Sequence, residues 1–414
     1  MTTEFRFHHA RLPNGLTVIG EHNPAAQSVA AGYFVNTGAR DESDEISGVS
    51  HFLEHMMFKG TARRSAEDIN REFDELGARS NAYTSEEHTV YYGAVLPEHR
   101  ERLLDLLSDM MRPALREDDF QVEKKVILEE IAMYQDRPNL RVFELGSRNF
   151  FRDHPLGNSV LGTPENIARL SREQMLEYFR SRYAPNNLVL TLAGAYDWDA
   201  TLAQVQAATQ EWESQTVVRS YPQLHQATGG DSLADEKLKR VHIGFWAPAP
   251  SAQSDLRYAA ALLASCLGDG SGSRLYWALV DKGTAEVAQM WHDSGDAAGS
   301  FMGYASTSPD RSAEVLEKVR EVLLEAHVEP PSPEEWERAR NKIATSLTLG
   351  AETPFGRLMS LGNSYLYNGA YQSQDELLAR VMSATREQSA EILAGRTFDG
   401  LYTLTLGPNG VAGA

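Results

Sequence analysis

The sequence places two histidines and a glutamate within five residues, in the apolar stretch SHFLEHMMFKG at 50–60. On a helix, His51 and His55 share a face because they are four residues apart, so both imidazoles can reach one point. Imidazole nitrogens are ligands for Zn²⁺, and a catalytic zinc commonly has three protein ligands and one open position. Glu54 lies beside that face and is the residue type that takes a proton from water and returns it to a leaving group. The pattern HxxEH, the reverse of HExxH, therefore indicates a hydrolytic metal site.

A third ligand is expected from the acidic helix predicted over 116–138. Glu123 and Glu130 are seven residues apart, which is two helical turns, so they share a face. Glu129 points about 100° away from Glu130. A solvated charged face is the simpler explanation of such an acidic run. Helical geometry alone does not decide between Glu129 and Glu130.

Strands and helices are mixed in the first half of the chain. Alternating and β-branched runs predict strands, and apolar residues at helical spacing predict helices. Ser47 or Ser50 lies near the start of the first helix, and Ser65 and Gly77 bound the second. The strands are expected near 16–22, 28–38, 87–96 and 187–194, and the helices near 45–58, 65–77, 98–111, 116–138 and 171–182. Antiparallel strands with helices packed on one face give an α+β fold.

The chain contains an internal repeat. Three short matches have offsets of 212 to 214 residues: GYF at 32–34 with GFW at 244–246, SREQ at 171–174 with TREQ at 385–388, and LTLAG at 190–194 with LTLGP at 404–408. Their agreement in order and spacing predicts two similar α+β domains made by duplication. We expect an N-terminal domain over 1–214, a polar linker over 215–236 and a C-terminal domain over 237–414.

Composition excludes several classes of protein. A chain of 414 residues suggests two domains, and its net charge of −19 without a basic block argues against nucleic acid or an anionic membrane as a partner. Cys266 is the single cysteine, so no internal disulfide framework is expected. The sequence lacks an apolar run long enough to span a membrane, and its first residues lack the pattern of a signal peptide. A cytoplasmic protein is expected.

The motifs resemble the pitrilysin/insulinase family of zinc metallopeptidases, most of all its short bacterial members related to mitochondrial processing peptidases. The family pattern is HxxEH, about 74 residues, and then a ligand glutamate; 74 residues separate His55 from Glu130. The resemblance therefore gives Glu130 the third-ligand role and Glu123 the role of an acidic residue that supports the site. Further similar stretches are LPNGLTVI, TGARDE, GVSHFLEHMMFKGT, LGARSNAYTSEEHTVYY and EKKVILEEIAMYQDRP.

The resemblance also implies fold, substrate and cofactor. Family members have two similar domains that face each other like a clamshell and cleave peptides or presequences held extended against an edge strand. Asn81, Ala82 and Tyr83 match that strand and are expected to contact the peptide, although Asn81 alone would fit a turn equally well. The expected activity is that of a zinc-dependent endopeptidase, in which zinc-activated water attacks the peptide carbonyl with Glu54 as general base.

The second half tests how many metals the chain holds. In the repeat, the two histidines correspond to Leu263 and Leu267, and Glu130 corresponds to Ser346. None of these three residues is a zinc ligand. One zinc per chain is expected, in the N-terminal domain, although Mn²⁺ or Co²⁺ could occupy similar ligands.

Two other functions are compatible with such a chain. It could be a non-catalytic subunit like the core proteins of respiratory complexes, in which the metal motif has typically decayed. It could instead bind peptides and present them to another subunit. The intact His51, Glu54, His55 and Glu130 argue against the first alternative.

One family feature is missing. Many members carry a segment resembling SRLxxxLREKxGLAYSV, whose later arginine and tyrosine hold the substrate carbonyl. Here SRLYWALVDKGTAEVAQM starts similarly, but Val280 and Glu286 occupy the positions of that pair. Valine cannot donate a hydrogen bond, and a glutamate would repel a developing oxyanion. Either Arg274 or Tyr276 replaces the pair, or a homologous second subunit supplies it, in a heterodimer or a homodimer.

Overall fold

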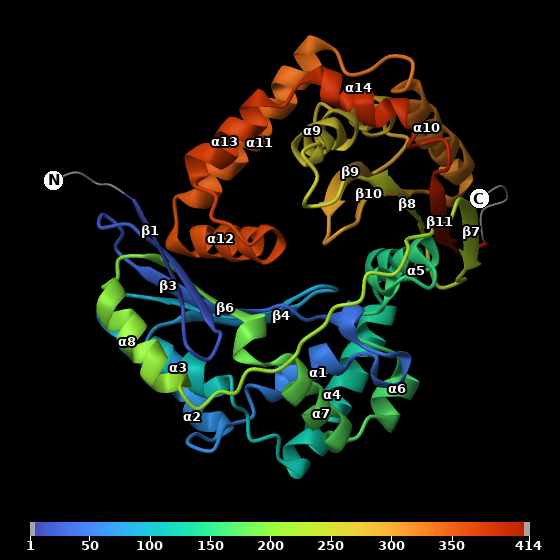
Figure 1. The fold of residues 1–414 in the computed structure, drawn as a ribbon. Helices are drawn as coiled ribbons and strands as arrows, with labels where there is room; N and C mark the ends of the chain where they lie inside the picture. The colour runs from blue at the N-terminus through green and yellow to red at the C-terminus, as the bar shows by residue number, and fades with distance from the viewer. Residues whose placement is uncertain (1–4, 410–414) are drawn as a thin grey trace. The chain divides into compact units, whose positions relative to one another are not determined.

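The computed structural model describes residues 5–409, and they form two compact units (Figure 1). The first unit contains the residues up to 132, 158–220 and 349–372, and the second contains 133–157, 221–348 and the residues from 373 onward. Each unit is a sheet with helices packed on it, so the predicted α+β class is confirmed. Within residues 5–409, no helix is long and apolar enough to cross a membrane.

The first unit is built on a six-stranded sheet with the order β1-β2-β6-β3-β5-β4. Its strands are β1 (Arg6–Arg11), β2 (Thr17–His22), β3 (Val29–Val35), β4 (Arg79–Thr84), β5 (Thr89–Val95) and β6 (Leu188–Gly194). Its helices are α1 (Val49–Met56), α2 (Ala66–Glu75), α3 (Arg100–Met110), most of α4 (Glu117–Gln135), α6 (Pro164–Arg169), α7 (Arg172–Arg182), α8 (Trp198–Thr209) and α12 (Pro354–Asn368).

The second unit has a five-stranded sheet with the order β7-β11-β8-β10-β9. Its strands are β7 (Gly229–Ala234), β8 (Val241–Ala249), β9 (Val287–Ser294), β10 (Gly299–Thr307) and β11 (Tyr402–Gly407). Its helices are α5 (Pro138–Phe151), α9 (Arg257–Gly268), α10 (Ser312–Glu325), most of α11 (Pro333–Ala351), α13 (Gln374–Ser383) and α14 (Arg386–Ala394).

The two sheets confirm the internal repeat. The order β2-β6-β3-β5-β4 corresponds strand by strand to β7-β11-β8-β10-β9. The matched GYF and GFW lie in β3 and β8, and LTLAG and LTLGP overlap β6 and β11. SREQ and TREQ are the capping boxes that start α7 and α14. Each short match therefore occupies an equivalent place in its unit.

The sheets are mixed, whereas the sequence predicted antiparallel sheets. β2 pairs with β6 in parallel and β11 pairs with β7 in parallel, while the other pairs are antiparallel. A parallel pair needs a long crossover connection. Residues 23–187 connect β2 to β6, so no local pattern in the sequence reveals that pairing.

Helices cover both faces of the first sheet, whereas the sequence predicted one. Successive strand side chains point to opposite faces. On β3, the Tyr33 hydroxyl lies 2.8 Å from Ser108 Oγ of α3, while Phe34 packs with Leu358 of α12. The second unit likewise takes α5 from the first half of the chain, where Val142 packs with Trp246 of β8. The compact units therefore differ from the sequence halves by an exchange of these two helices.

Local signals at the ends of elements behave as the sequence suggests. Ser65 accepts a hydrogen bond from the Asp68 N–H at the start of α2, and Gly77 follows the helix with a φ of +58°. The predicted linker over 215–236 has no regular structure in its first part, but its residues Gly229–Ala234 form β7. Strand pairing with β11, over 160 residues away, turns that polar segment into the edge of a sheet.

Candidate metal centre

Helix α1 carries the HxxEH residues. It spans Val49–Met56, shorter than the predicted 45–58, and its N-cap is Gly48 rather than Ser47 or Ser50. His51 is 8 % exposed and Glu54 is 9 % exposed, while His55 is partly exposed. Burying polar side chains such as those of His51 and Glu54 costs free energy unless they have partners, so their surroundings must be accounted for.

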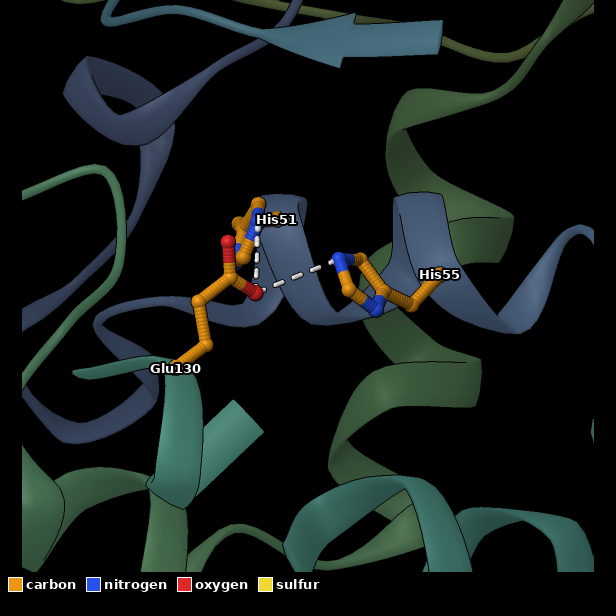
Figure 2. Close-up of side chains that lie close together, drawn as sticks. All are labelled: His51, His55 and Glu130. Atoms are coloured by element: carbon orange, nitrogen blue, oxygen red, sulfur yellow. Dashed lines mark ion pairs between the residues drawn. The ribbon is translucent and has the colours of Figure 1, made fainter. Parts of the chain in front are cut away.

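Glu130 on α4 faces both histidines (Figure 2). Its Oε2 lies 3.7 Å from Nε2 of His51 and 3.5 Å from Nε2 of His55. These separations are too long for hydrogen bonds, which are about 2.7–3.2 Å. They are close to the separation of roughly 3.3 Å between two tetrahedral ligands whose bonds to Zn²⁺ are ~2.0–2.1 Å. The donor set and its spacing therefore fit a zinc ion.

Glu129, the alternative third ligand, is exposed on the same helix. Within residues 5–409, His51, His55 and Glu130 are the one group of three or more His, Cys, Asp or Glu side chains close enough to hold a metal ion. Of the two glutamates that helical geometry left open, Glu130 is the one that lies next to both imidazoles.

Glu123 contacts the ring nitrogen of His55 that does not face Glu130. Its Nδ1 lies 2.8 Å from Oε1 of Glu123, and Nζ of Lys59 lies 2.6 Å from the other oxygen of that carboxylate. Burial would raise the pKa of Glu123, but the hydrogen bonds from His55 and Lys59 outweigh it and lower the pKa. An ionised Glu123 accepts the Nδ1–H of His55 and leaves Nε2 with its lone pair toward Glu130.

The two histidines have different environments. Burial and the neighbouring His55 lower the pKa of His51 to about 3, so its imidazole is neutral. Its Nδ1 is buried and has no hydrogen-bond partner among the described residues. Burial also opposes protonation of His55, but its hydrogen bond to Glu123 and the charges of Glu130 and Glu54 outweigh it and raise the pKa. A metal-binding imidazole must be neutral at its donor nitrogen before the ion binds, and the low pKa of His51 satisfies this requirement.

Glu54 is held beside this cluster by β4. The Thr84 hydroxyl donates to Oε2 of Glu54 at 2.6 Å. Burial raises the pKa of Glu54, and the charge of Glu130 acts in the same direction, against the Thr84 bond and the charge of His55. A carboxylate with a raised pKa is a stronger base than an exposed one.

The predicted peptide-contacting residues lie on β4, at the end of the first sheet. Asn81, Ala82 and Tyr83 pair with Tyr92, Tyr91 and Val90 of β5, and among the described residues β4 pairs with no other strand. Ala82 is buried and the Asn81 side chain is exposed. An edge strand of this kind can pair with an extended peptide. Asn81 is therefore a strand residue rather than a turn residue.

The Tyr83 hydroxyl already has neighbours in its unit. It lies 3.3 Å from Nε2 of His88 and 3.5 Å from Oδ1 of Asn363 on α12. The side chain of Tyr83 is thus directed toward these two residues.

Sequence reasoning missed two residues that orient the site, Lys59 and Thr84. Both lie inside stretches that carried the family resemblance, FKG and NAYTS. Their positions were a signal, because Lys59 follows His55 and Thr84 follows Tyr83 closely in the sequence. Neither was selected, because neither residue type is a metal ligand or a general base in this setting.

The second unit holds no such cluster within its described part. Leu263 and Leu267, which correspond to the histidines, are buried on α9. Arg274, one candidate for the missing substrate contact, donates to the Glu335 carboxylate at 2.8 and 2.9 Å and to the Glu329 carbonyl at 2.8 Å. Its guanidinium is therefore engaged within its own unit.

Comparison with known proteins agrees with this geometry. The family model Insulinase (Peptidase family M16) matches residues 17–164, and the model Peptidase M16 inactive domain matches residues 169–343. An uncharacterized zinc protease of Bacillus subtilis, YmxG, is 32 % identical over 95 % of this chain and 96 % of its own length. An uncharacterized zinc protease of Streptomyces coelicolor, SCO5738, is 32 % identical over 90 % of this chain and 83 % of its own.

Solved structures show the same fold. A protease from Helicobacter pylori superimposes with a TM-score of 0.91 at 19 % identity, over 98 % of this chain and 100 % of that one. A putative M16-like peptidase from Alicyclobacillus acidocaldarius has a TM-score of 0.83 at 22 % identity, over 98 % and 99 % of the two chains. With both family models and near-full-length relatives in agreement, this chain belongs to the insulinase family, peptidase family M16.

Proposed function

We propose that this chain is a zinc-dependent endopeptidase with Glu54 as its general base. The observation that supports this most is the convergence of His51 Nε2, His55 Nε2 and Glu130 Oε2, with distances of 3.7 and 3.5 Å from the carboxylate oxygen. Glu54 lies beside this group and Glu123 lies behind His55. His51, His55 and Glu130 would hold the metal.

Zinc bound there would polarise the peptide carbonyl and lower the pKa of water. Glu54 takes the proton of the attacking water, and its raised pKa favours this uptake. Glu54 then donates the proton to the departing nitrogen. The Thr84 hydroxyl keeps the Glu54 carboxylate in one orientation. Glu123 keeps His55 in the tautomer with a free Nε2, and Lys59 keeps Glu123 ionised.

We further propose that an extended peptide or presequence pairs with the free edge of β4. Backbone hydrogen bonds along Asn81, Ala82 and Tyr83 would hold it, and side-chain pockets would set preference. Thr84 follows directly on the same strand and contacts Glu54. A peptide on β4 would therefore lie beside the general base.

The same chain is proposed to be the metal-bearing member of a pair of homologous subunits. Val280 and Glu286 occupy the positions at which other family members have an arginine and a tyrosine. Glu286 forms an ion pair with Arg240, and Arg274 is engaged with Glu335. A donor to the developing oxyanion would then come from a second chain.

The proposal is tested by metal removal and restoration. The purified chain is assayed for zinc content and for cleavage of quenched peptides, before and after treatment with a chelator. We expect about one zinc per chain, loss of both zinc and cleavage on chelation, and recovery of both when Zn²⁺ is added back. Mn²⁺ and Co²⁺ are compared in the same step.

Three results would contradict the proposal. A chain that binds no zinc would be the non-catalytic core-type subunit. A chain whose peptide cleavage persists unchanged after complete metal removal would use other chemistry. Zinc binding with peptide binding but no cleavage, even with a homologous partner, would identify a peptide-presenting subunit.

A further inference from the structure

The N-terminus of α1 has an unusual cap. Its N-cap residue is Gly48, with a φ of +91°, so the N-cap position has no side chain to bond the free backbone N–H groups of the first turn. A Cβ at Gly48 would lie 2.6 Å from the Leu161 carbonyl oxygen and 2.8 Å from Cδ1 of Ile167. Serine, threonine or aspartate, the usual caps, would not fit there. The helix that carries His51, Glu54 and His55 must be capped from elsewhere.

Glu42 supplies that cap from six residues before Gly48. Its Oε2 accepts the Gly48 N–H at 2.6 Å, and its Oε1 accepts the Ser50 N–H at 2.7 Å. A capping box normally needs two side chains to serve the N-cap N–H and an N–H of the first turn. Here a single carboxylate serves both. Burial raises the pKa of Glu42 to about 8, and its hydrogen bonds from the Ser50 and Gly48 N–H groups act in the opposite direction.

The loop that carries Glu42 is itself anchored. Glu42 is 8 % exposed and follows a 3-10 turn at Ala39–Asp41. The adjacent Asp41 pairs with Arg182 and accepts hydrogen bonds from Arg219 at 3.1 and 2.7 Å. The carboxylate of Glu42 is thus presented from a fixed backbone.

A second contact fixes the same turn of α1. The Ser50 hydroxyl lies 2.6 Å from the Tyr178 hydroxyl, which lies 3.1 Å from Oγ1 of Thr37. All three side chains are buried. Ser50 is therefore held through its backbone by Glu42 and through its side chain by Tyr178, and the next residue is His51.

From these contacts we infer that Glu42 is a positioning residue for the metal site, acting on His51 through the first turn of α1. The inference rests on the proposed zinc-binding function. Helix α1 has only eight residues, and so short a helix is not stable by itself. His55 has its own support from Glu123, whereas no described residue hydrogen-bonds to Nδ1 of His51. Loss of the Glu42 cap would therefore move His51 more than His55.

If Glu42 only stabilised the fold, its replacement would lower the free energy of unfolding without a specific effect on zinc binding. Glu21 provides the matched control for this case. Glu21 is also a buried carboxylate of the first unit, 4 % exposed. It accepts hydrogen bonds from Arg357 at 2.8 and 2.6 Å and from Tyr371 at 2.8 Å, all three residues lying outside α1. Its replacement removes buried bonds without touching the first turn of the metal helix.

The test compares Glu42→Ala, Glu42→Gln and Glu21→Gln with the wild type. Three quantities are measured: the zinc dissociation constant against a chromogenic chelator, the visible absorption of the Co²⁺ form, and the free energy of unfolding of the metal-free protein in urea. Glu42→Ala should raise the zinc dissociation constant ~10–100-fold, as loss of a supporting contact does at other metal sites. Its Co²⁺ absorption should also change, because one ligand is displaced.

Glu42→Gln should raise the dissociation constant less, because its amide oxygen still accepts one N–H while its NH₂ faces the other donor. Glu21→Gln should lower the free energy of unfolding and leave the dissociation constant and Co²⁺ absorption as in the wild type. If Glu42→Ala does not fold, Glu42→Gln provides the same comparison.

Wild-type zinc affinity and Co²⁺ absorption in both Glu42 variants would overturn the inference and leave the proposed function standing. An equal rise in the dissociation constant for Glu21→Gln would also overturn it, because the effect would then be general destabilisation. A wild-type chain that binds no zinc would overturn the proposed function itself.

Discussion

At the scale of residues, the candidate site depends on which side chains of α1 and α4 face each other, and Oε2 of Glu130 lies 3.7 Å from Nε2 of His51 and 3.5 Å from Nε2 of His55. His51, Glu54 and His55 could be selected because their spacing suits one helical face. The choice between Glu129 and Glu130 needed the family resemblance, because a helix alone does not show which of its faces meets another helix. Packing of α4 against α1 places Glu130 at 3.5 Å from His55. Glu42 could not be selected, because the sequence does not show that its carboxylate folds back onto the first turn of α1.

The position of Glu130 predicts a difference between two adjacent variants. Glu130→Gln should weaken zinc binding by more than the ~10–100-fold typical of lost supporting contacts, because a charged ligand is removed. Glu129→Gln, one residue away and exposed, should bind zinc as the wild type does. Zinc content after gel filtration, together with chelator competition, measures both. If the two variants exchange these results, Glu129 is the ligand.

The ion pair of Lys59 with Glu123 predicts that replacing Lys59 weakens zinc binding less than replacing Glu130 does. Lys59→Met should raise the zinc dissociation constant ~10-fold, because Glu123 then holds His55 less firmly. Lys125→Met removes an exposed lysine from α4 and is the matched control. Chelator competition on both variants measures the effect. Equal affinities in the two variants would show that Lys59 does not support the site.

At the scale of elements, signals at helix ends were predictable and long-range pairing was not. Ser65 at the start of α2 and the matched SREQ and TREQ boxes of α7 and α14 act over three residues, so the sequence shows them directly. The parallel pair of β2 with β6 and the packing of α12 on β3 join segments more than 160 residues apart. Such contacts depend on how whole faces of a sheet and a helix fit together, and a short sequence pattern does not show this fit.

The turn between β4 and β5 predicts a pH effect on stability. His88 is 8 % exposed, and burial together with the charge of Arg219 lowers its pKa to about 4, below the value of 6.5 expected in the unfolded chain. Between these values the unfolded state binds a proton that the folded state does not, so stability falls as the pH decreases from 6.5 toward 4. The loss from this residue should be on the order of 2 kcal/mol by pH 5.

Urea unfolding of the metal-free protein at pH 7.5 and pH 5 measures this effect. The wild type should lose more free energy of unfolding between the two conditions than His88→Gln, which has no titrating imidazole. Equal losses in the two proteins would mean that His88 is protonated in the folded state.

At the scale of the whole molecule, the duplication could be predicted from the sequence because three short sequence matches recur at nearly the same offset. They fall on equivalent elements of the two units. The exchange of α5 and α12 could not be predicted, because nothing in either helix's sequence shows that it packs in the unit formed mainly by the other half of the chain. Only one half carries a cluster that fits a metal ion within residues 5–409. A homologous partner is the expected source of the missing arginine and tyrosine.

This arrangement predicts that the purified chain binds zinc but cleaves peptides slowly. Adding a homologous chain with the arginine–tyrosine segment should increase turnover ~10²–10³-fold, the usual effect of an oxyanion donor. Cleavage of a quenched peptide by each chain and by their mixture measures the gain. Full turnover by the single chain, unchanged by the partner, would show that its own residues complete the site.

The most direct test of the central claim is Glu54→Gln, measured for zinc content and for peptide cleavage with and without the homologous partner chain, with Glu129→Gln as control. Glutamine keeps the shape of the side chain and removes its ability to take a proton, so zinc should stay near one per chain. Cleavage should fall by ~10²–10⁴ or more, because the general base is lost. The control should keep both properties. Full peptide cleavage by Glu54→Gln with zinc bound would contradict the account.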